Sequence, residues 1–145
     1  MARVLRSVLP DGHFHVYCRG VAGGLAFRDD ADRSRFLTLT RLCEQRHDWM
    51  IDALAILSTH YHLVLEATRQ NLSAGLQWLN GRYAREFNKR HACFGHVFAE
   101  RFQARVIESE DYLYDVCAYV VQNPVQAGLC DRTEHWPWSY CRYDV

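Results

Sequence analysis

The chain has no excess of charge of either sign. Its 145 residues include 17 Lys and Arg and 17 Asp and Glu, so the formal net charge is zero. This balance excludes a strongly basic protein that coats nucleic acid regardless of sequence. Any contact with nucleic acid must therefore come from a local cluster of cations.

Long apolar runs are also lacking. No segment approaches the roughly 20 apolar residues that span a bilayer. The first residues, MARVLRSVLPDG, contain no apolar stretch of signal-peptide length. We therefore expect a soluble, cytoplasmic protein that has no membrane partner.

The six cysteines never occur as CxxC, the spacing of many zinc sites. We expect them to be reduced and mostly buried thiols rather than a disulfide framework. No repeat, low-complexity tract or Pro/Gly/Ser-rich linker divides the sequence either. A length of 145 residues is enough to bury one core but too short for a second full domain. Residues 1–145 are therefore predicted to form a single domain.

Seven elements are predicted from the spacing of the apolar residues, with period two for strands and three- or four-residue steps for helices. Strands are expected over 13–18, 50–57, 61–67 and 101–107, and helices over 31–46, 72–89 and from 109–111 until Pro124 stops the last one. The order β-α-β-β-α-β-α is typical of an α+β fold with a ferredoxin-like antiparallel sheet. We expect the helices to pack on one face of this sheet, and a short aromatic tail to follow.

A local cluster of cations lies between residues 82 and 105, where six basic side chains accompany only two acidic ones. The basic residues are Arg82, Arg85, Lys89, Arg90, Arg101 and Arg105. On charge alone, two interpretations stay open: a solvated helix face, or a surface that contacts the phosphates of a nucleic acid.

The motif His60-Tyr61-His62 lies in a predicted strand, where alternate side chains project to the same face. Both imidazoles would then point to one side of the sheet and could share a metal ion, while Tyr61 would point to the other side. Two half-buried histidines hydrogen-bonded to the backbone would give the same pattern. A second HxH motif occupies residues 13–15, so spacing alone does not choose between the two.

The last predicted helix has an apolar face made of Leu113, Val116, Cys117 and Val120. Tyr119 and Asn123 lie one turn apart on a stripe beside that face. A phenol and a carboxamide would therefore lie side by side at the edge of the core. A tyrosine in such a position can equally be a packing residue whose hydroxyl is satisfied.

Several longer motifs follow one another along the chain: HYHLVLE, GRYAREFNKRH, GHVFAERFQARVIESEDYL, YVVQNPVQAGL and WPWSY. Together they resemble successive blocks of the HUH single-tyrosine transposases of insertion-sequence type, and most of all the REP-associated tyrosine transposases. The resemblance extends from about His15 to Tyr140, which is nearly the whole chain.

The resemblance implies a role for each residue of the two motifs above. His60 and His62 match the metal-binding histidines of the family, Tyr119 matches its nucleophile, and Asn123 matches the polar residue that can complete the metal site. His15 matches a first-strand histidine that lies outside the metal-binding pair.

Two positions depart from the family pattern. Thr59 stands where the family commonly has Asn, and Tyr61 stands between the two histidines where an aliphatic residue is usual. Neither departure removes a metal ligand.

The activity implied by the resemblance is cleavage and strand transfer of single-stranded DNA. Tyr119 would attack a phosphate, form a 5′-phosphotyrosine and release a 3′-hydroxyl. Two imidazoles and an amide oxygen suit Mg²⁺ or Mn²⁺, although Zn²⁺ also binds such ligands. The metal would neutralise and polarise the phosphate.

The expected partner is single-stranded DNA that folds into a palindromic hairpin. The cation cluster would contact its backbone, with Trp136 and Trp138 as weaker stacking candidates. Both a homodimer and a monomer stay open, because relatives of both kinds exist.

Two other functions compete with this interpretation. One is a domesticated DNA- or RNA-hairpin-binding protein that no longer cuts. The other is a zinc hydrolase in which Glu66 would serve as the general base beside His60 and His62.

Overall fold

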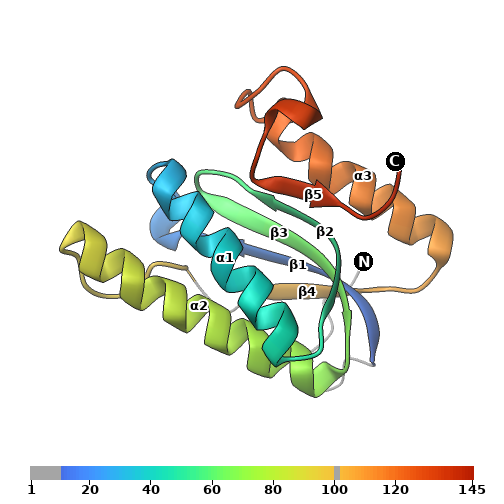
Figure 1. Ribbon diagram of the computed structural model, residues 1–145, viewed down its shortest axis with the longest axis horizontal. Helices are drawn as coiled ribbons and strands as arrows, with labels where there is room; N and C mark the ends of the chain where they lie inside the picture. Colours follow the sequence, from blue (N-terminus) through green and yellow to red (C-terminus); the bar gives the residue numbers. More distant parts are fainter. Residues whose placement is uncertain (1–10, 100–101) are drawn as a thin grey trace.

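The fold is a five-stranded antiparallel sheet with the strand order β4-β1-β3-β2-β5 and three long helices (Figure 1). The computed structural model describes residues 11–99 and 102–145. The elements in chain order are β1 (Gly12–Arg19), η2 (Val21–Gly23), α1 (Asp30–Arg46), β2 (Met50–Ile56), β3 (His60–Ala67), α2 (Arg69–His91), β4 (Gln103–Ile107), α3 (Glu110–Gln126), η3 (Thr133–His135) and β5 (Ser139–Cys141). The α+β class and the predicted order of the first seven long elements are confirmed.

Each long helix begins at a polar residue whose side chain accepts a hydrogen bond from a backbone N–H of the first turn. These caps are Asp29 for α1, Thr68 for α2 and Ser109 for α3. The caps satisfy N–H groups that have no partner inside the helix. The helix starts are therefore fixed by local chemistry.

The helices occupy both faces of the sheet. α1 and α2 cover one face, where they pack against side chains such as Phe14, Val16 and Leu63. α3 packs on the opposite face, against Ala53 and Val64 among others. In Figure 1 the central strands lie between α2 and α3. The expectation that helices pack on one face thus holds for α1 and α2, whereas α3 differs.

The position of α3 follows from the composition of β2. Every residue of this strand from Ile51 to Ile56 is buried, so the strand does not alternate between apolar and polar side chains. A strand of this kind is covered on both faces. The apolar face of α3 supplies the second cover, because Leu113, Val116, Cys117 and Val120 are all buried in the cluster that contains Ala53 and Ala55.

The predicted stop at Pro124 is wrong, because α3 continues to Gln126 and contains this proline. Pro124 lies in the last turn of the helix, where its missing N–H removes only one helical hydrogen bond. Its ring is buried, and the helix closes with a bond from the Ala127 N–H to the Asn123 carbonyl. Asn123 therefore keeps a helical position one turn after Tyr119.

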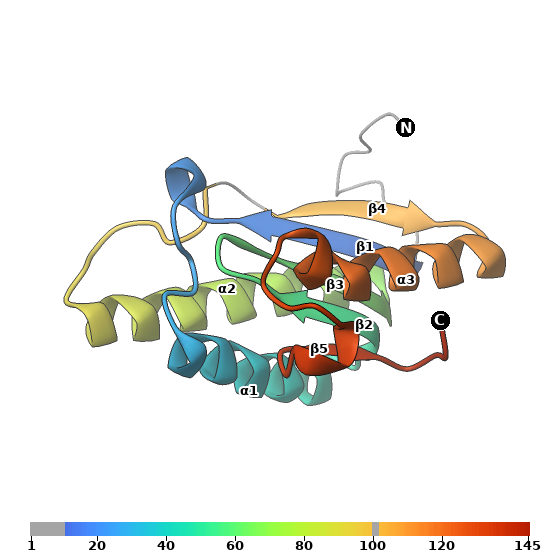
Figure 2. The same ribbon diagram turned by 90° about the horizontal axis from the view of Figure 1, so that it is seen from above.

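The C-terminal tail adds a strand that the sequence pattern did not predict. β5 pairs with β2 at one edge of the sheet, while β4 lies beside β1 at the other (Figure 2). Before β5, the indole N–H of Trp136 donates to the Ile56 carbonyl, and that of Trp138 donates to Ser34 Oγ. The tail is thus bound to the sheet and to α1.

The turn that precedes His60 is held by Arg33 of α1. Arg33 is only 8% exposed. Its Nε donates to the Leu57 carbonyl at 3.1 Å and its Nη2 donates to Ser58 Oγ at 2.8 Å. The guanidinium carbon also lies 5.2 Å from the ring centre of Trp136. Arg33 therefore joins α1, the β2–β3 turn and the tail.

Arg33→Met should lower the free energy of unfolding by roughly 2–4 kcal/mol, because it leaves buried acceptors without their charged donor. Urea denaturation measures this change. Arg35→Met is a matched control on the same helix, since the ion pair of Arg35 with Glu86 is partly exposed and should contribute less than about 1 kcal/mol. Equal losses for the two variants would contradict the anchoring role of Arg33.

Candidate active site

The two histidines of β3 lie on the face of the sheet that α3 covers. The ring centres of His60 and His62 are 5.1 Å apart. Tyr61 points to the opposite core, where it is fully buried and its hydroxyl donates to Asn80 Oδ1 at 2.7 Å. The predicted same-face arrangement of the two imidazoles is confirmed. Tyr61 has no access to this site.

The second HxH motif is divided between two places on the same face. His13 lies at the far end, where its Nδ1 is 2.9 Å from Asp52 Oδ2. His15 reaches the candidate site, since its Nε2 lies 3.0 Å from His62 Nδ1 and the two rings stack with centres 5.2 Å apart. Sequence reasoning missed this contact. Only the antiparallel pairing of β1 with β3 brings the two histidines together.

Helix α3 brings the tyrosine of the predicted site to these histidines. Tyr119 contacts them edge-on, with its ring centre 5.8 Å from that of His62 and 6.1 Å from that of His15. About half of its surface, 49%, is exposed, so its phenol can be reached from solvent. One turn later, the side chain of Asn123 forms a hydrogen bond with His60. The four residues proposed for catalysis and metal binding thus lie together.

A second tyrosine also borders the histidines. Tyr17 of β1 lies on the same face, with its ring centre 5.0 Å from that of His62 and 5.4 Å from that of His60. The motifs gave no signal for it, because its position depends on the pairing of Tyr17 with His62 across the sheet. Tyr17 therefore borders the site from β1.

Burial keeps these imidazoles neutral. Desolvation lowers the pKa of His62 to about 3, and the neighbouring His15 and His60 add to the effect. Desolvation, together with the positive charge of Arg105, lowers the pKa of His15 to about 4. Burial also lowers the pKa of His60, although the hydrogen bond with Asn123 acts in the other direction. Neutral imidazoles offer the lone pairs that a metal ion requires.

The donor atoms fit a divalent cation. Nδ1 of His60 lies 3.0 Å from Thr59 Oγ1, and Nδ1 of His62 faces His15, so Nε2 is the nitrogen of each ring that these two contacts leave. The amide of Asn123 lies beside His60. Across residues 11–99 and 102–145, no three His, Cys, Asp or Glu side chains group as a metal site. A bound ion would therefore need the amide oxygen, water or phosphate to complete its coordination.

The predicted cation cluster does not form one surface. Arg105 of β4 is exposed and pairs in register with His15, on the face of the candidate site. Arg82, Arg85 and Lys89 are exposed on α2, which covers the other face.

Two further cations of the cluster stand apart. Arg90 binds Asp29 at 2.6 Å and Asp32 at 2.7 Å, so carboxylates already occupy its guanidinium. Arg101 lies outside the described residues. Arg105 is thus the one member of the predicted cluster that the described part of the chain places beside the histidines.

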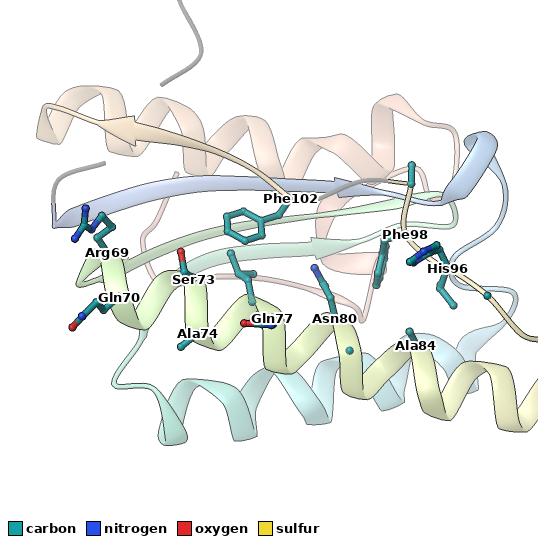
Figure 3. Close-up of a pocket in the computed structure, with 15 residues that line it drawn as sticks. Arg69, Gln70, Ser73, Ala74, Gln77, Asn80, Ala84, His96, Phe98 and Phe102 are labelled. Atoms are coloured by element: carbon teal, nitrogen blue, oxygen red, sulfur yellow. The ribbon is translucent and has the colours of Figure 1, made fainter. Parts of the chain in front are cut away.

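A large groove lies elsewhere, along α2. Its volume is about 920 Å³, and Ser73, Gln77, Asn80, Phe98 and Phe102 contribute to its lining (Figure 3). This groove is on the face covered by α1 and α2, opposite to the histidines. The candidate site lies instead between β1, β3 and α3, where His62 is only 3% exposed. None of the helices described is long and apolar enough to cross a membrane.

The chain is similar to transposases in sequence and in fold. The family model described as "Transposase IS200 like" matches residues 13–123. A protein of Haemophilus influenzae, named as a candidate REP-associated tyrosine transposase, is 25% identical over 104 residues. That match covers 64% of this chain and 59% of the relative, so the chain spans less than two thirds of the relative's length.

Two solved structures share the fold. A REP-associated tyrosine transposase bound to a REP hairpin superposes with a TM-score of 0.78 at 14% identity, covering 96% of this chain and 82% of that one. A candidate transposase from Deinococcus radiodurans R1 gives a TM-score of 0.56 at 16% identity, covering 82% of this chain and 95% of that one. At these identities the two structures establish the fold alone.

The neutral histidines should make the protein sensitive to mild acid. Because the folded-state pKa values of His15 and His62 lie below the ordinary value of 6.5, the unfolded chain binds protons that the folded chain does not. Stability should therefore fall as the pH drops from about 6.5 toward 4, by up to about 1.4 kcal/mol per pH unit for each histidine.

Urea titrations at several pH values measure this slope. His15→Gln should flatten it, whereas His96→Gln, which removes an exposed histidine, should leave it unchanged. The same slope in His15→Gln and in the unmodified protein would contradict the buried, neutral state of His15.

Proposed function

The chain belongs to the IS200-like transposase family, whose model matches 13–123, and from this premise we propose that it cuts and transfers single-stranded DNA with Tyr119 as the nucleophile. The observation that carries the proposal is the placement of Tyr119, which packs edge-on against His62 and remains 49% exposed. A reactive phenol must meet both conditions, because it has to lie beside the groups that hold the phosphate and be open to DNA.

The covalent chemistry needs no external oxidant or energy source. The Tyr119 oxygen attacks phosphorus, a new O–P bond forms, and the bond from phosphorus to the 3′ oxygen breaks. The phenol loses one proton and the leaving 3′ oxygen gains one, so protons balance. The phosphotyrosine conserves the energy of the broken bond, and a second 3′-hydroxyl can reverse the step to join another strand.

His60, His62 and Asn123 would hold Mg²⁺ or Mn²⁺ through two Nε2 atoms and one amide oxygen. Transposases of this family generally use a divalent metal. When bound, such an ion neutralises and polarises the scissile phosphate. The role of the protein is to keep both imidazoles neutral and on one face, which burial and the alternation of β3 achieve. Thr59 stands where the family commonly has Asn. The contact of its Oγ1 with Nδ1 of His60 helps to orient the imidazole of His60.

We propose a DNA hairpin as the substrate. A structurally similar transposase was solved bound to a REP hairpin. Arg105, exposed beside His15, is the first candidate for a phosphate contact near the reacting centre. Arg82, Arg85 and Lys89 would contact DNA that extends around to α2, while Arg90 and Arg101 stay weaker candidates. A single domain, a cytoplasmic location and either a monomer or a homodimer stay predictions.

Tyr119→Phe should abolish formation of a covalent protein–DNA adduct. The test incubates the protein with Mg²⁺ or Mn²⁺ and end-labelled single-stranded hairpins from the DNA that flanks its gene, and then resolves the products on denaturing gels. Tyr112→Phe is the matched control, because Tyr112 lies two turns earlier on α3 and is similarly exposed, at 39%. This control should form the adduct at the rate of the unmodified protein.

The second candidate, a hairpin-binding protein that no longer cuts, is favoured by the lack of a third acidic or imidazole ligand among the described residues. It predicts tight hairpin binding without an adduct, and no effect of Tyr119→Phe on binding. Such a result with every flanking hairpin would refute the proposed cleavage.

Arg105→Gln should weaken hairpin binding and reduce the slope of log K against log salt concentration by about 1, the value expected for one lost phosphate contact. Fluorescence anisotropy at several salt concentrations measures both quantities. Arg46→Gln removes a cation from the end of α1, where Arg46 packs over Trp78 on the other layer of the molecule. That control should keep the original slope, and equal slopes for all three proteins would exclude Arg105 from the DNA contact.

A further inference from the structure

The contact between His15 and His62 constrains where the protons of both rings lie. Nε2 of His15 and Nδ1 of His62 are 3.0 Å apart, so one nitrogen donates a hydrogen and the other accepts it. A neutral imidazole has a single N–H. The choice of donor therefore decides which nitrogen of His62 keeps a lone pair.

Only one of the two arrangements suits a metal ligand. When His62 donates from Nδ1, its Nε2 holds a lone pair that can bind a cation. When His15 donates instead, Nδ1 of His62 must be the acceptor, and its proton moves to Nε2 and blocks that atom. The partner of Nδ1 thus controls whether His62 can act as a ligand.

His60 resembles His62 in that its Nδ1 also has a polar neighbour. Its Nδ1 lies 3.0 Å from the hydroxyl oxygen of Thr59, which can accept a hydrogen bond. Both histidines of the motif therefore have Nδ1 engaged by a neighbouring side chain. In each ring the remaining nitrogen is Nε2.

We propose that His15 is a positioning residue, which accepts the Nδ1–H of His62 and so holds its Nε2 lone pair and ring plane ready for a divalent cation. This role rests on the proposed function, because it assigns His62 as a metal ligand. His15 acts through His62 and does not bind the metal itself. The stacking of the two rings, with an angle of 21° between their planes, fixes the orientation together with the hydrogen bond.

Both neighbouring strands and α3 border His15. Val64 is its register partner on β3, and Arg105 is its register partner on β4. Tyr119 contacts both rings edge-on, at 77° to His15 and 85° to His62. The same pair of rings thus forms the surface against which the nucleophile packs.

Three variants separate hydrogen bonding from mere space filling. His15→Gln places an amide oxygen at about the reach of Nε2, so it preserves the acceptor. His15→Asn is also polar but too short to reach His62, and His15→Leu removes the acceptor altogether. His96→Leu, at an exposed position, controls for the loss of a histidine.

Two measurements test the role without relying on cleavage. Long-range ¹H–¹⁵N NMR of the metal-free protein reports which nitrogen of His62 carries the proton, and calorimetry with Mn²⁺ reports the affinity of the site. In the unmodified protein, His15→Gln and His96→Leu, we expect the proton on Nδ1 of His62. In His15→Asn and His15→Leu we expect a mixture of tautomers and a loss of Mn²⁺ affinity of about 10- to 100-fold.

The outcomes distinguish the two proposals. If His15→Asn and His15→Leu keep the His62 tautomer and the Mn²⁺ affinity, while the unmodified protein binds Mn²⁺ and forms the DNA adduct, the positioning role is overturned and the proposed function stands. If the unmodified protein binds no Mn²⁺, the metal site and the positioning role both fail. Should His15→Leu not fold, the comparison of His15→Gln with His15→Asn decides the question.

Discussion

Strand β3 lies at the centre of the sheet and is covered by helices on both faces, so each of its residues belongs to one of two layers. Tyr61 and Leu63 enter the core under α1 and α2. Val64 enters the core under α3, and His60 and His62 share its face. A shift of one residue in register would exchange the two sets and bury the imidazoles in an aromatic core. The candidate site therefore depends on the same alternation that stabilises the fold.

The packing of α3 on the face opposite to α1 and α2 brings the other residues of the candidate site to the two histidines. α3 is apolar enough on one side to cover β2 and β3, and the stripe beside its buried face carries Tyr119 and Asn123 to the histidines. Had α3 packed beside α1 and α2, Tyr119 would face the wrong side of the sheet. The departure from the predicted one-sided arrangement is thus a requirement of the proposed chemistry. Pro124 is compatible with it because the proline lies in the last turn of the helix.

Local periodicity was enough to predict much of the architecture. The buried face of α3 and the common direction of His60 and His62 are confirmed, because each depends only on spacing along one element. The contact of His15 with His62 and the position of β5 depend on pairing between strands far apart in the sequence, which no local pattern encodes. The cation cluster shows the same limit, since neighbours in the sequence lie on opposite faces of the sheet. The sequence of β2 did carry a signal for the position of α3, because its residues from Ile51 to Ile56 are apolar except for Asp52, and such a run is typical of a strand covered on both sides.

We propose that two strand histidines and one helix form a single cation site beside Tyr119. The most direct measurement is the anomalous scattering of Mn²⁺ in crystals of the protein. We expect one ion bound by Nε2 of His60 and Nε2 of His62, next to the side chains of Asn123 and Tyr119. We also expect His15 to be hydrogen-bonded to His62. An ion bound away from these histidines, or one that takes His15 as a direct ligand in place of Asn123, would contradict this proposal.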